Sequence, residues 1–140
     1  MDISVSKDFA VNSKSLKDVR DFAREIFDKS PVFSEQKDEL VLAIAEAAQN
    51  IVKHAYKDIL NTKDVMQIKI SFKNNELTIG FYDKGKPANP DNIKHRKLDD
   101  VKPGGLGTFF IKQIMDEVVF KEAAGWRNHL VLTKNFNHQQ

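Results

Sequence analysis

The apolar residues near the start of the chain change their spacing from every second position to every third or fourth. Ile3 and Val5 alternate with polar residues, which is typical of a strand with one buried face. From residue 16 to residue 27 the apolar positions follow a helical period, after a capping residue at Asn12 or Ser13. The pattern therefore predicts a first strand followed by a helix.

A second, longer helix is expected after Pro31, which ends the first helical region. Ser34 is the candidate cap, and the helix is expected to run to about Tyr56. At 100° per residue one side of this helix is apolar and would face the core. The apolar positions are Leu40, Ile44, Ala48, Ile51 and Ala55.

The second half of the chain predicts a hairpin, a long loop, a helix and two closing strands. Residues 65–72 and 77–82 read as strands joined by a turn at Asn74-Asn75. Residues 84–105 hold three of the four prolines and are expected to form a loop, and loops of this length are usually functional or disordered. The remaining predicted elements are a helix at 106–115 and strands at 118–120 and 130–133.

This order of elements predicts an α+β fold: a two-layer α/β sandwich whose mixed, mostly antiparallel sheet carries its helices on one face. The 140 residues are expected to form a single domain, 1–140, because the chain shows no internal repeat or linker. An apolar fraction of 41% is enough for one folded core.

Charge and composition exclude several classes of function. The 22 basic and 20 acidic residues nearly cancel, so no bulk nucleic-acid binder is indicated. The absence of cysteine excludes disulfides, thiolate metal sites and cysteine nucleophiles. No apolar run approaches the roughly twenty residues that span a bilayer, and no signal peptide is evident, so a cytoplasmic protein without a membrane partner is expected.

Three polar side chains on the second helix suggest chemistry. Glu46, Asn50 and His54 are spaced four residues apart and would form one row on the helix surface. The carboxamide oxygen of Asn50 suits Mg²⁺ bound to a triphosphate, and Glu46 could accept a proton from a hydroxyl near the γ-phosphate. The alternative is that these residues simply belong to a solvated helix face.

Two further motifs would complete a nucleotide site. Asp83 ends an apolar strand, where a carboxylate needs a donor such as the amino group of adenine, and Gly85 would let the chain turn beside the base. Glycines at 104, 105 and 107 precede a helix whose N-terminus could hold phosphate oxygens. Alternatively, the first motif is an ordinary Asp-x-Gly turn and the second an ordinary entry into a helix.

Taken together, these motifs resemble the ATP-binding domain of the GHKL superfamily (gyrase, the ninety-kilodalton heat-shock chaperone, histidine kinases and MutL). They resemble most closely the bacterial anti-sigma factor serine/threonine-protein kinases of the sporulation and general-stress type. Three runs carry the resemblance, which covers nearly the whole chain: Glu46 to Lys57, Asp83-Lys-Gly85-Lys-Pro87, and Gly104-Gly105-Leu106-Gly107 continuing to Val118.

The resemblance implies a Bergerat-type fold that binds ATP and Mg²⁺, with Asn50 as the metal ligand and Glu46 as the catalytic base. Asp83 would read adenine, and residues 86–103 would form a lid. The other implied nucleotide-binding residues are Lys53, His54, Gly85, Pro87, Gly104, Gly105, Leu106, Gly107 and Thr108.

The resemblance also implies partners. The acceptor would be a serine or threonine on a STAS-domain anti-sigma antagonist, and the kinase would sequester a sigma factor and form a homodimer. Arg20 could face a partner, as in related proteins. An alternative of a different class is a non-catalytic, nucleotide-gated module that sequesters a sigma factor or another regulator.

One segment departs from the family pattern. Near the last strand many relatives carry a Gly-Thr pair beside the adenine pocket, where this chain has Gly125-Trp-Arg-Asn128. The resemblance therefore does not carry over the second contact to adenine, whereas the rest of the site is unaffected.

Overall fold

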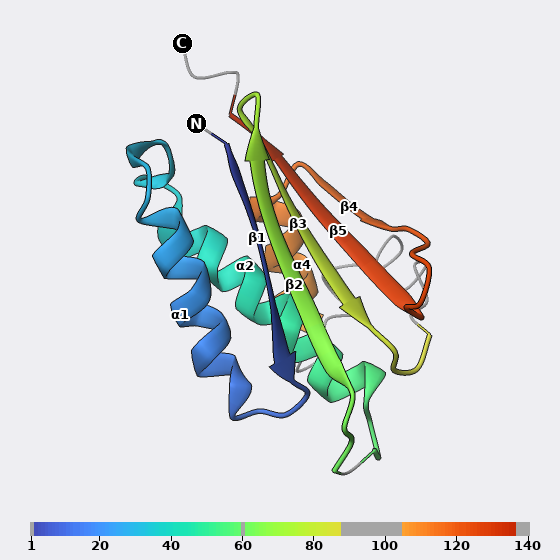
Figure 1. The fold of residues 1–140 in the computed structure, drawn as a ribbon. Helices are drawn as coiled ribbons and strands as arrows, with labels where there is room; N and C mark the ends of the chain where they lie inside the picture. The colour runs from blue at the N-terminus through green and yellow to red at the C-terminus, as the bar shows by residue number, and fades with distance from the viewer. Residues whose placement is uncertain (1, 60, 88–104, 137–140) are drawn as a thin grey trace.

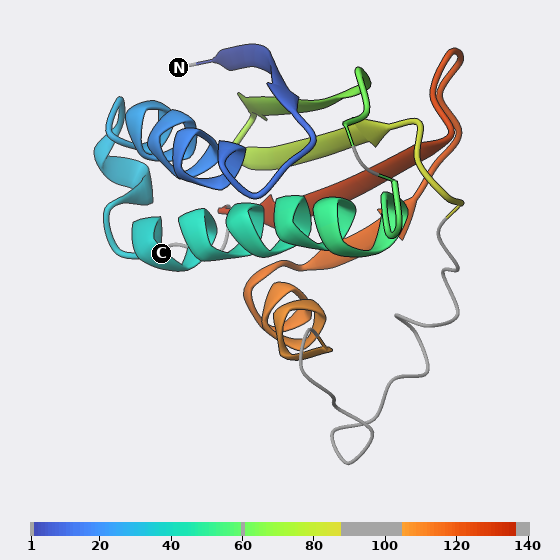
Figure 2. The same cartoon turned by 90° about the horizontal axis from the view of Figure 1, so that it is seen from below.

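A computed structural model describes residues 2–59, 61–87 and 105–136, which form a layer of helices packed on one face of a β-sheet (Figures 1 and 2). Helix α2 lies between α1 and α4 in the helical layer (Figure 2). In chain order the elements are β1 (Ile3–Ala10), α1 (Ser15–Phe27), the 3₁₀ helix η1 (Pro31–Phe33), α2 (Lys37–Asn50), the π-helix η2 (Ile51–Ala55), β2 (Val65–Lys73), β3 (Glu76–Asp83), α4 (Gly105–Ile114), β4 (Glu117–Phe120) and β5 (Asn128–Asn135).

The five-stranded sheet has the order β1-β2-β3-β5-β4, and each of these neighbouring pairs is antiparallel. The predicted α+β two-layer sandwich is therefore confirmed. Because β5 enters the sheet between β3 and β4, the end of β3 meets the start of β5, and Asp83 lies directly opposite Asn128.

The hairpin between β2 and β3 turns at the predicted position. Asn74 and Asn75 both adopt left-handed backbone conformations, with φ of 53° and 62°. Two consecutive residues with positive φ are typical of the type I′ turn, whose twist matches that of the flanking strands, and asparagine tolerates this conformation.

The first helix starts close to the expected position, with Lys14 rather than Asn12 or Ser13 directly before it, whereas the second helix starts later than expected. Asn12 accepts a hydrogen bond from the backbone N–H of Ser15 at 3.1 Å, at the start of α1. The expectation that Ser34 caps the second helix is wrong, because Pro31 opens a 3₁₀ turn first and Ser30 caps that turn. Helix α2 begins at Lys37. None of the described helices is long and apolar enough to cross a membrane.

The second helix also does not remain α-helical to Tyr56. From Ile51 to Ala55 the backbone is a π-helix, and the N–H of Tyr56 donates to the carbonyl of Ile51 at 3.2 Å. The wider turn rotates the following residues about the helix axis. The expected row of side chains through Glu46, Asn50 and His54 therefore ends at Asn50.

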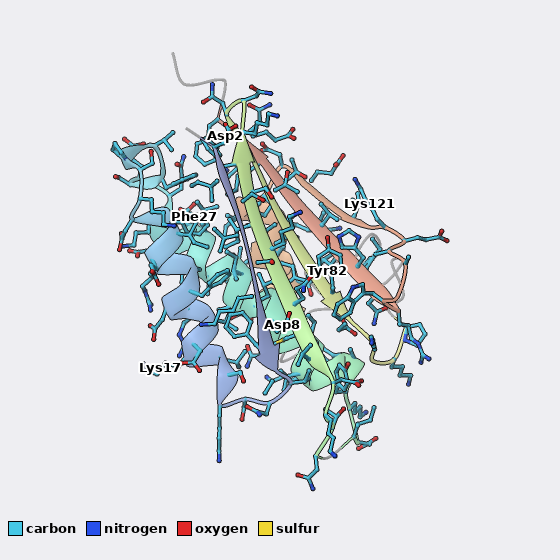
Figure 3. The ribbon with its side chains drawn as sticks, viewed as in Figure 1. Asp2, Asp8, Lys17, Phe27, Tyr82 and Lys121 are labelled. Atoms are coloured by element: carbon cyan, nitrogen blue, oxygen red, sulfur yellow. The ribbon has the colours of Figure 1, made fainter. Side chains whose placement is uncertain are left out.

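Aromatic rings anchor the helices to the sheet at one end of the core. The Phe33 side chain is fully buried, and its ring centroid lies 4.9 Å from that of Phe72 on β2. The rings of Phe27 on α1 and of Phe136 after β5 lie 5.1 Å and 5.5 Å away. Figure 3 shows Phe27 among the side chains that fill the space between α1 and the sheet. Phe33 therefore packs the helical layer against β2 and against the residue that follows β5.

We expect Phe33→Ala to lower the free energy of unfolding by about 3–5 kcal/mol, because it removes a fully buried ring and leaves a cavity. The measurement is chemical denaturation followed by circular dichroism. The matched control is Phe110→Ala, since Phe110 is 43% exposed and its removal should change stability by about 0.5 kcal/mol or less. Equal losses for the two variants would contradict the assignment of Phe33 as a core anchor.

Candidate functional site

The side chain of Glu46, on α2, lies against the first turn of α4. Gly107 is buried there, and a Cβ atom added to it would overlap a carboxylate oxygen of Glu46 and lie 3.2 Å from its Cδ. Only glycine lets the carboxylate come this close to the backbone of α4. The structure thus brings together two residues that are 61 positions apart, by the difference of their numbers.

Asn50 lies one turn further along α2 and faces the same end of α4. Its amide nitrogen donates a long hydrogen bond of 3.4 Å to the hydroxyl of Thr108. Because this contact uses the nitrogen, the carbonyl oxygen of Asn50 is the atom that could ligate a cation. The structure thus groups Glu46, Asn50, Gly107 and Thr108 at the α2–α4 contact.

Asp83, at the end of β3, is only 3% exposed. Its Oδ1 accepts hydrogen bonds from the backbone N–H of Gly85 at 2.9 Å and from the side-chain amide of Asn128 at 2.8 Å. Burial raises the pKa of this carboxyl, the two hydrogen bonds oppose that rise, and the charge of Asp64 adds to it. Asp83 is therefore a buried acid whose charged form is stabilised by two fixed donors.

The turn after Asp83 packs directly on the end of the π-helix. The N–H of Lys86 donates to the carbonyl of Ala55 at 2.6 Å. A Cβ added to Gly85 would lie 2.5 Å from that carbonyl oxygen and 2.8 Å from the ring of Tyr56. Gly85 is therefore required by close approach of the backbone.

Tyr56 connects three segments through its hydroxyl group. The hydroxyl accepts a hydrogen bond from the backbone N–H of Lys84 at 3.1 Å and donates to the carboxylate of Asp64 at 3.0 Å. The pKa of Tyr56 is raised to about 12: burial is the largest cause, the hydrogen bond from Lys84 opposes the rise, and the hydrogen bond to Asp64 adds to it. The phenol thus stays neutral and keeps both contacts at physiological pH.

The structure therefore places predicted site residues in two groups, at opposite ends of residues 46–56. One group is the α2–α4 contact, and the other consists of Asp83 and Gly85, which lie with Asn128 against the end of the π-helix. Helix α4 begins at Gly105, one residue before the expected start at Leu106, and ends at Ile114.

The remaining predicted residues are less closely tied to these two groups. Lys53 and His54 are exposed on the π-helix, and Pro87 is exposed at the end of its segment. For the side chains of Lys53 and His54, the described part of the chain supplies no hydrogen bond or ion pair. Gly104 and residues 88–103 of the expected lid lie outside the described residues.

Two residues of the site were not assigned a role from the sequence. Asn128 was noticed only as a departure from the family pattern, and its place opposite Asp83 follows from the strand register. Tyr56 was part of a matched motif, but its contact with Lys84 depends on the π-helix, which no sequence pattern predicted.

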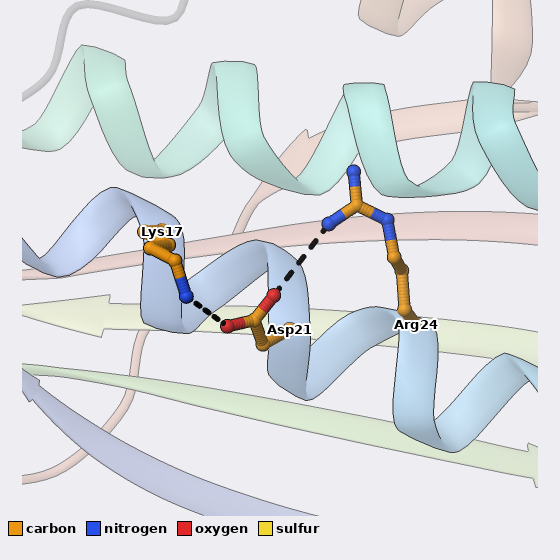
Figure 4. Close-up of polar contacts among 3 residues, drawn as sticks. All are labelled: Lys17, Asp21 and Arg24. Carbon is orange, nitrogen blue, oxygen red and sulfur yellow. Dashed lines mark hydrogen bonds and ion pairs between the residues drawn. The ribbon is translucent and has the colours of Figure 1, made fainter.

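A cleft of about 360 Å³ opens between α1 and α2 and reaches Glu46. Arg20 and Arg24 line it from α1. On α1, Asp21 lies 3.0 Å from the ammonium of Lys17 and 3.6 Å from the guanidinium of Arg24, which extends towards α2 (Figure 4). The hydrogen bond from Lys17 is the main reason that the pKa of Asp21 lies below its usual value. Glu46 therefore faces Gly107 and also borders a cleft with two arginines.

The sequence that forms this site matches a known protein family. Residues 9–134 match the family model of the histidine kinase-like ATPase domain. The chain belongs to this family, and its predicted membership among the anti-sigma factor kinases of the GHKL superfamily is confirmed.

The chain is also similar to individual proteins. The chain is 30% identical over 107 residues to the serine-protein kinase RsbW of Staphylococcus aureus, in strains bovine RF122 / ET3-1, MRSA252 and JH9. The aligned region covers 70% of this chain and 67% of each relative.

We expect Tyr56→Phe to lower the free energy of unfolding by about 1–3 kcal/mol, because the backbone N–H of Lys84 and the carboxylate of Asp64 both lose a buried partner. The control is Tyr82→Phe, which changes a half-buried tyrosine on the face of the sheet opposite the helices (Figure 3). Its expected effect is below about 0.5 kcal/mol.

Tyr56→Phe and its control also test the raised pKa of Tyr56. A tyrosine whose pKa is higher in the folded than in the unfolded chain contributes stability below pH 10, and this contribution is lost as pH rises from 10 to about 12. The stability difference between wild type and Tyr56→Phe should therefore shrink over this interval. A difference that stays constant or grows up to pH 12 would contradict the assignment.

Proposed function

We propose that this chain is an ATP- and Mg²⁺-dependent serine/threonine-protein kinase that also acts as an anti-sigma factor. It would phosphorylate a STAS-domain anti-sigma antagonist and sequester a sigma factor when that antagonist is phosphorylated. The observation that carries the proposal is the placement of the Glu46 carboxylate and the Asn50 carboxamide against the glycine-led start of α4. The serine-protein kinase relatives support the type of reaction.

The residues at the α2–α4 contact fit a magnesium-bound triphosphate. Gly107 carries no Cβ in the first turn of α4, and a helix N-terminus favours anionic groups. Asn50 provides a neutral oxygen, which ligates a cation without repelling phosphate. When bound, magnesium would neutralise charge that develops on the phosphate oxygens. Thr108 orients the Asn50 carboxamide through its hydroxyl.

Glu46 is the residue we assign as general base. It is half-buried, and it lies both beside Gly107 and at the cleft between α1 and α2. An acceptor hydroxyl that approaches along this cleft could therefore donate its proton to Glu46. In phosphoryl transfer most of the rate acceleration comes from positioning and charge neutralisation, so the base supplies only part of it.

At the other end of the site, Asp83 would read the adenine amino group. Its Oδ1 is held by Gly85 and Asn128, and the carboxylate is buried at the end of an apolar strand. A buried carboxylate that gains a further N–H donor is relieved of part of its desolvation. Binding of the base would therefore compensate a group that is unfavourable in the free protein.

The proposed partners are proteins, and the cleft between α1 and α2 is a candidate for their contact. Arg20 and Arg24 would attract acidic side chains, and Leu42, which is 41% exposed, adds an apolar surface there. Homodimerisation and a cytoplasmic location are proposed from the family resemblance alone. The second candidate function is the nucleotide-gated module without kinase activity.

We expect Glu46→Gln to retain ATP binding and to slow phosphoryl transfer by roughly 10²–10⁴-fold, because it preserves shape while removing the proton acceptor. The assay follows label from ATP onto a purified STAS-domain antagonist, and calorimetry measures ATP affinity. Glu39→Gln is the matched control, since Glu39 is an exposed glutamate on the same helix and should leave the rate unchanged.

The outcomes separate the two candidate functions. Unchanged transfer in Glu46→Gln would remove Glu46 from the role of base. If wild type binds ATP and holds a sigma factor but labels no antagonist, the non-catalytic module is the correct function. If wild type does not bind ATP, both proposals fail.

We expect Asp83→Asn to weaken ATP binding at least about 100-fold, because an amide can place a donor against the adenine amino group. The same variant should not lower the free energy of unfolding, since its oxygen can still accept from Gly85 and Asn128 while the cost of a buried charge is removed. Calorimetry with ATP and thermal unfolding of the free protein measure the two effects. Unchanged ATP affinity would remove Asp83 from the base-binding role.

A further inference from the structure

We propose that Asn128 is a positioning residue that fixes the Asp83 carboxylate as a hydrogen-bond acceptor and thereby sets a preference for purines with a 6-amino group over those with a 6-oxo group. The inference rests on the proposed ATP site and adds to it the residue that controls how the site reads the base. It concerns a position at which this chain differs from the Gly-Thr pair of many relatives.

The contacts of Asn128 support this role. Its side-chain nitrogen lies 2.8 Å from Oδ1 of Asp83 and 3.0 Å from the backbone carbonyl of Lys86. An amide nitrogen carries two hydrogens, so one nitrogen donates to both acceptors. Asn128 therefore connects the acid to the turn that follows it.

Backbone geometry holds Asn128 in this place. It is the direct cross-strand partner of Asp83 in the β3–β5 pair, and it is 8% exposed. The neighbouring N–H of Arg127 donates to the carbonyl of Asp83 at 3.0 Å. The two side chains thus meet inside the structure, where a hydrogen bond to a charged group is strong.

The hydrogen bonds to Asp83 determine the direction in which its carboxylate can accept a further hydrogen bond. The Gly85 N–H and the Asn128 amide both donate to the same oxygen, Oδ1. These two bonds fix the plane of the carboxylate and satisfy both lone pairs of Oδ1, so we assign Oδ2 as the atom that meets the base. A charged carboxylate accepts hydrogen bonds and cannot donate them.

This restriction gives the site its selectivity. A 6-amino purine presents an N–H donor to the carboxylate, whereas a 6-oxo purine presents an acceptor oxygen that the carboxylate repels. A protonated Asp83 would lose the distinction, because its O–H could donate to the 6-oxo group. Any change that favours the protonated acid should therefore reduce the preference for ATP over inosine triphosphate (ITP).

Several groups influence the protonation of Asp83. Burial and the charge of Asp64 favour the neutral acid, and the donors Asn128 and Gly85 favour the carboxylate. Tyr56 lies between the two acids, bonded through its hydroxyl to Asp64 and to the N–H of Lys84. Of the two donors to Asp83, only Asn128 donates from its side chain, so a substitution can remove this donor without changing the charge of the protein.

The test compares Asn128→Thr with Asn128→Val, which have nearly the same shape and both suit a strand. Threonine keeps one donor and valine has none. Calorimetry measures the affinities for ATP and ITP, with Mg²⁺, between pH 5 and pH 8. We expect the valine variant to bind ATP about ten- to a hundredfold more weakly than the threonine variant at pH 7.5.

The pH profile separates positioning from a merely structural role. As pH falls, the ratio of ATP to ITP affinity should decline, and the valine variant should reach this decline closer to neutral pH than either wild type or the threonine variant. The control is Gln67→Leu, which removes another carboxamide that donates to a carboxylate, Asp8, at 3.0 Å on an exposed part of the sheet. Its affinities and its profile should match those of wild type.

Each outcome supports or contradicts the positioning role of Asn128. If the folded valine variant keeps the ATP to ITP ratio and the pH profile of the threonine variant, the positioning role is wrong and the proposed function stands. If wild type binds neither nucleotide, the proposed function itself fails. If the valine variant does not fold, Asn128→Ser and Asn128→Ala supply the same comparison with smaller side chains, and the same equality between them would overturn the role.

Discussion

The contact between Gly85 and the end of the π-helix determines how the rest of the site is arranged. Lys86 donates to the carbonyl of Ala55, and the absence of a side chain at Gly85 allows this approach. The contact adds a direct backbone hydrogen bond between the turn after Asp83 and the end of the helical segment that carries Glu46 and Asn50. It therefore fixes the two groups of polar residues more closely than the shared core alone would do.

The π-helix has a specific role in this contact. In a regular α-helix the carbonyl of Ile51 would accept from residue 55, whereas here it accepts from Tyr56. The extra residue in the turn accompanies the burial of the Tyr56 ring and of its hydroxyl beside Lys84. The local irregularity therefore serves the packing of a distant turn, and interruptions of this kind often occur at functional sites.

Much of the fold could be predicted from the sequence, because its strands and helices have clear periods. The hairpin at Asn74-Asn75 and the helix that starts on the glycines follow directly from local backbone preferences. The late start of α2 could not be predicted from a cap rule alone, since Ser30 and Ser34 are equivalent in type and only the 3₁₀ turn at Pro31 distinguishes them.

The same reasoning explains what could be predicted of the candidate site. Glu46, Asn50, Asp83 and Gly107 were selected as candidates because each residue type has a recognisable chemical use in its local pattern. The role of Asn128 depends on strand register over a separation of 45 residues, which no local pattern contains. The π-helix depends on tertiary contacts and is equally invisible in the sequence.

The order of the strands has a consequence for how the protein is made. Strand β5 lies inside the sheet, although it comes from the last part of the described chain. During synthesis the carboxylate at the end of β3 emerges from the ribosome well before its amide partner on β5, and such long-range pairings form late in folding. A nascent chain therefore presents an incompletely fixed acid, and the proposed nucleobase-reading site would be complete only when β5 inserts.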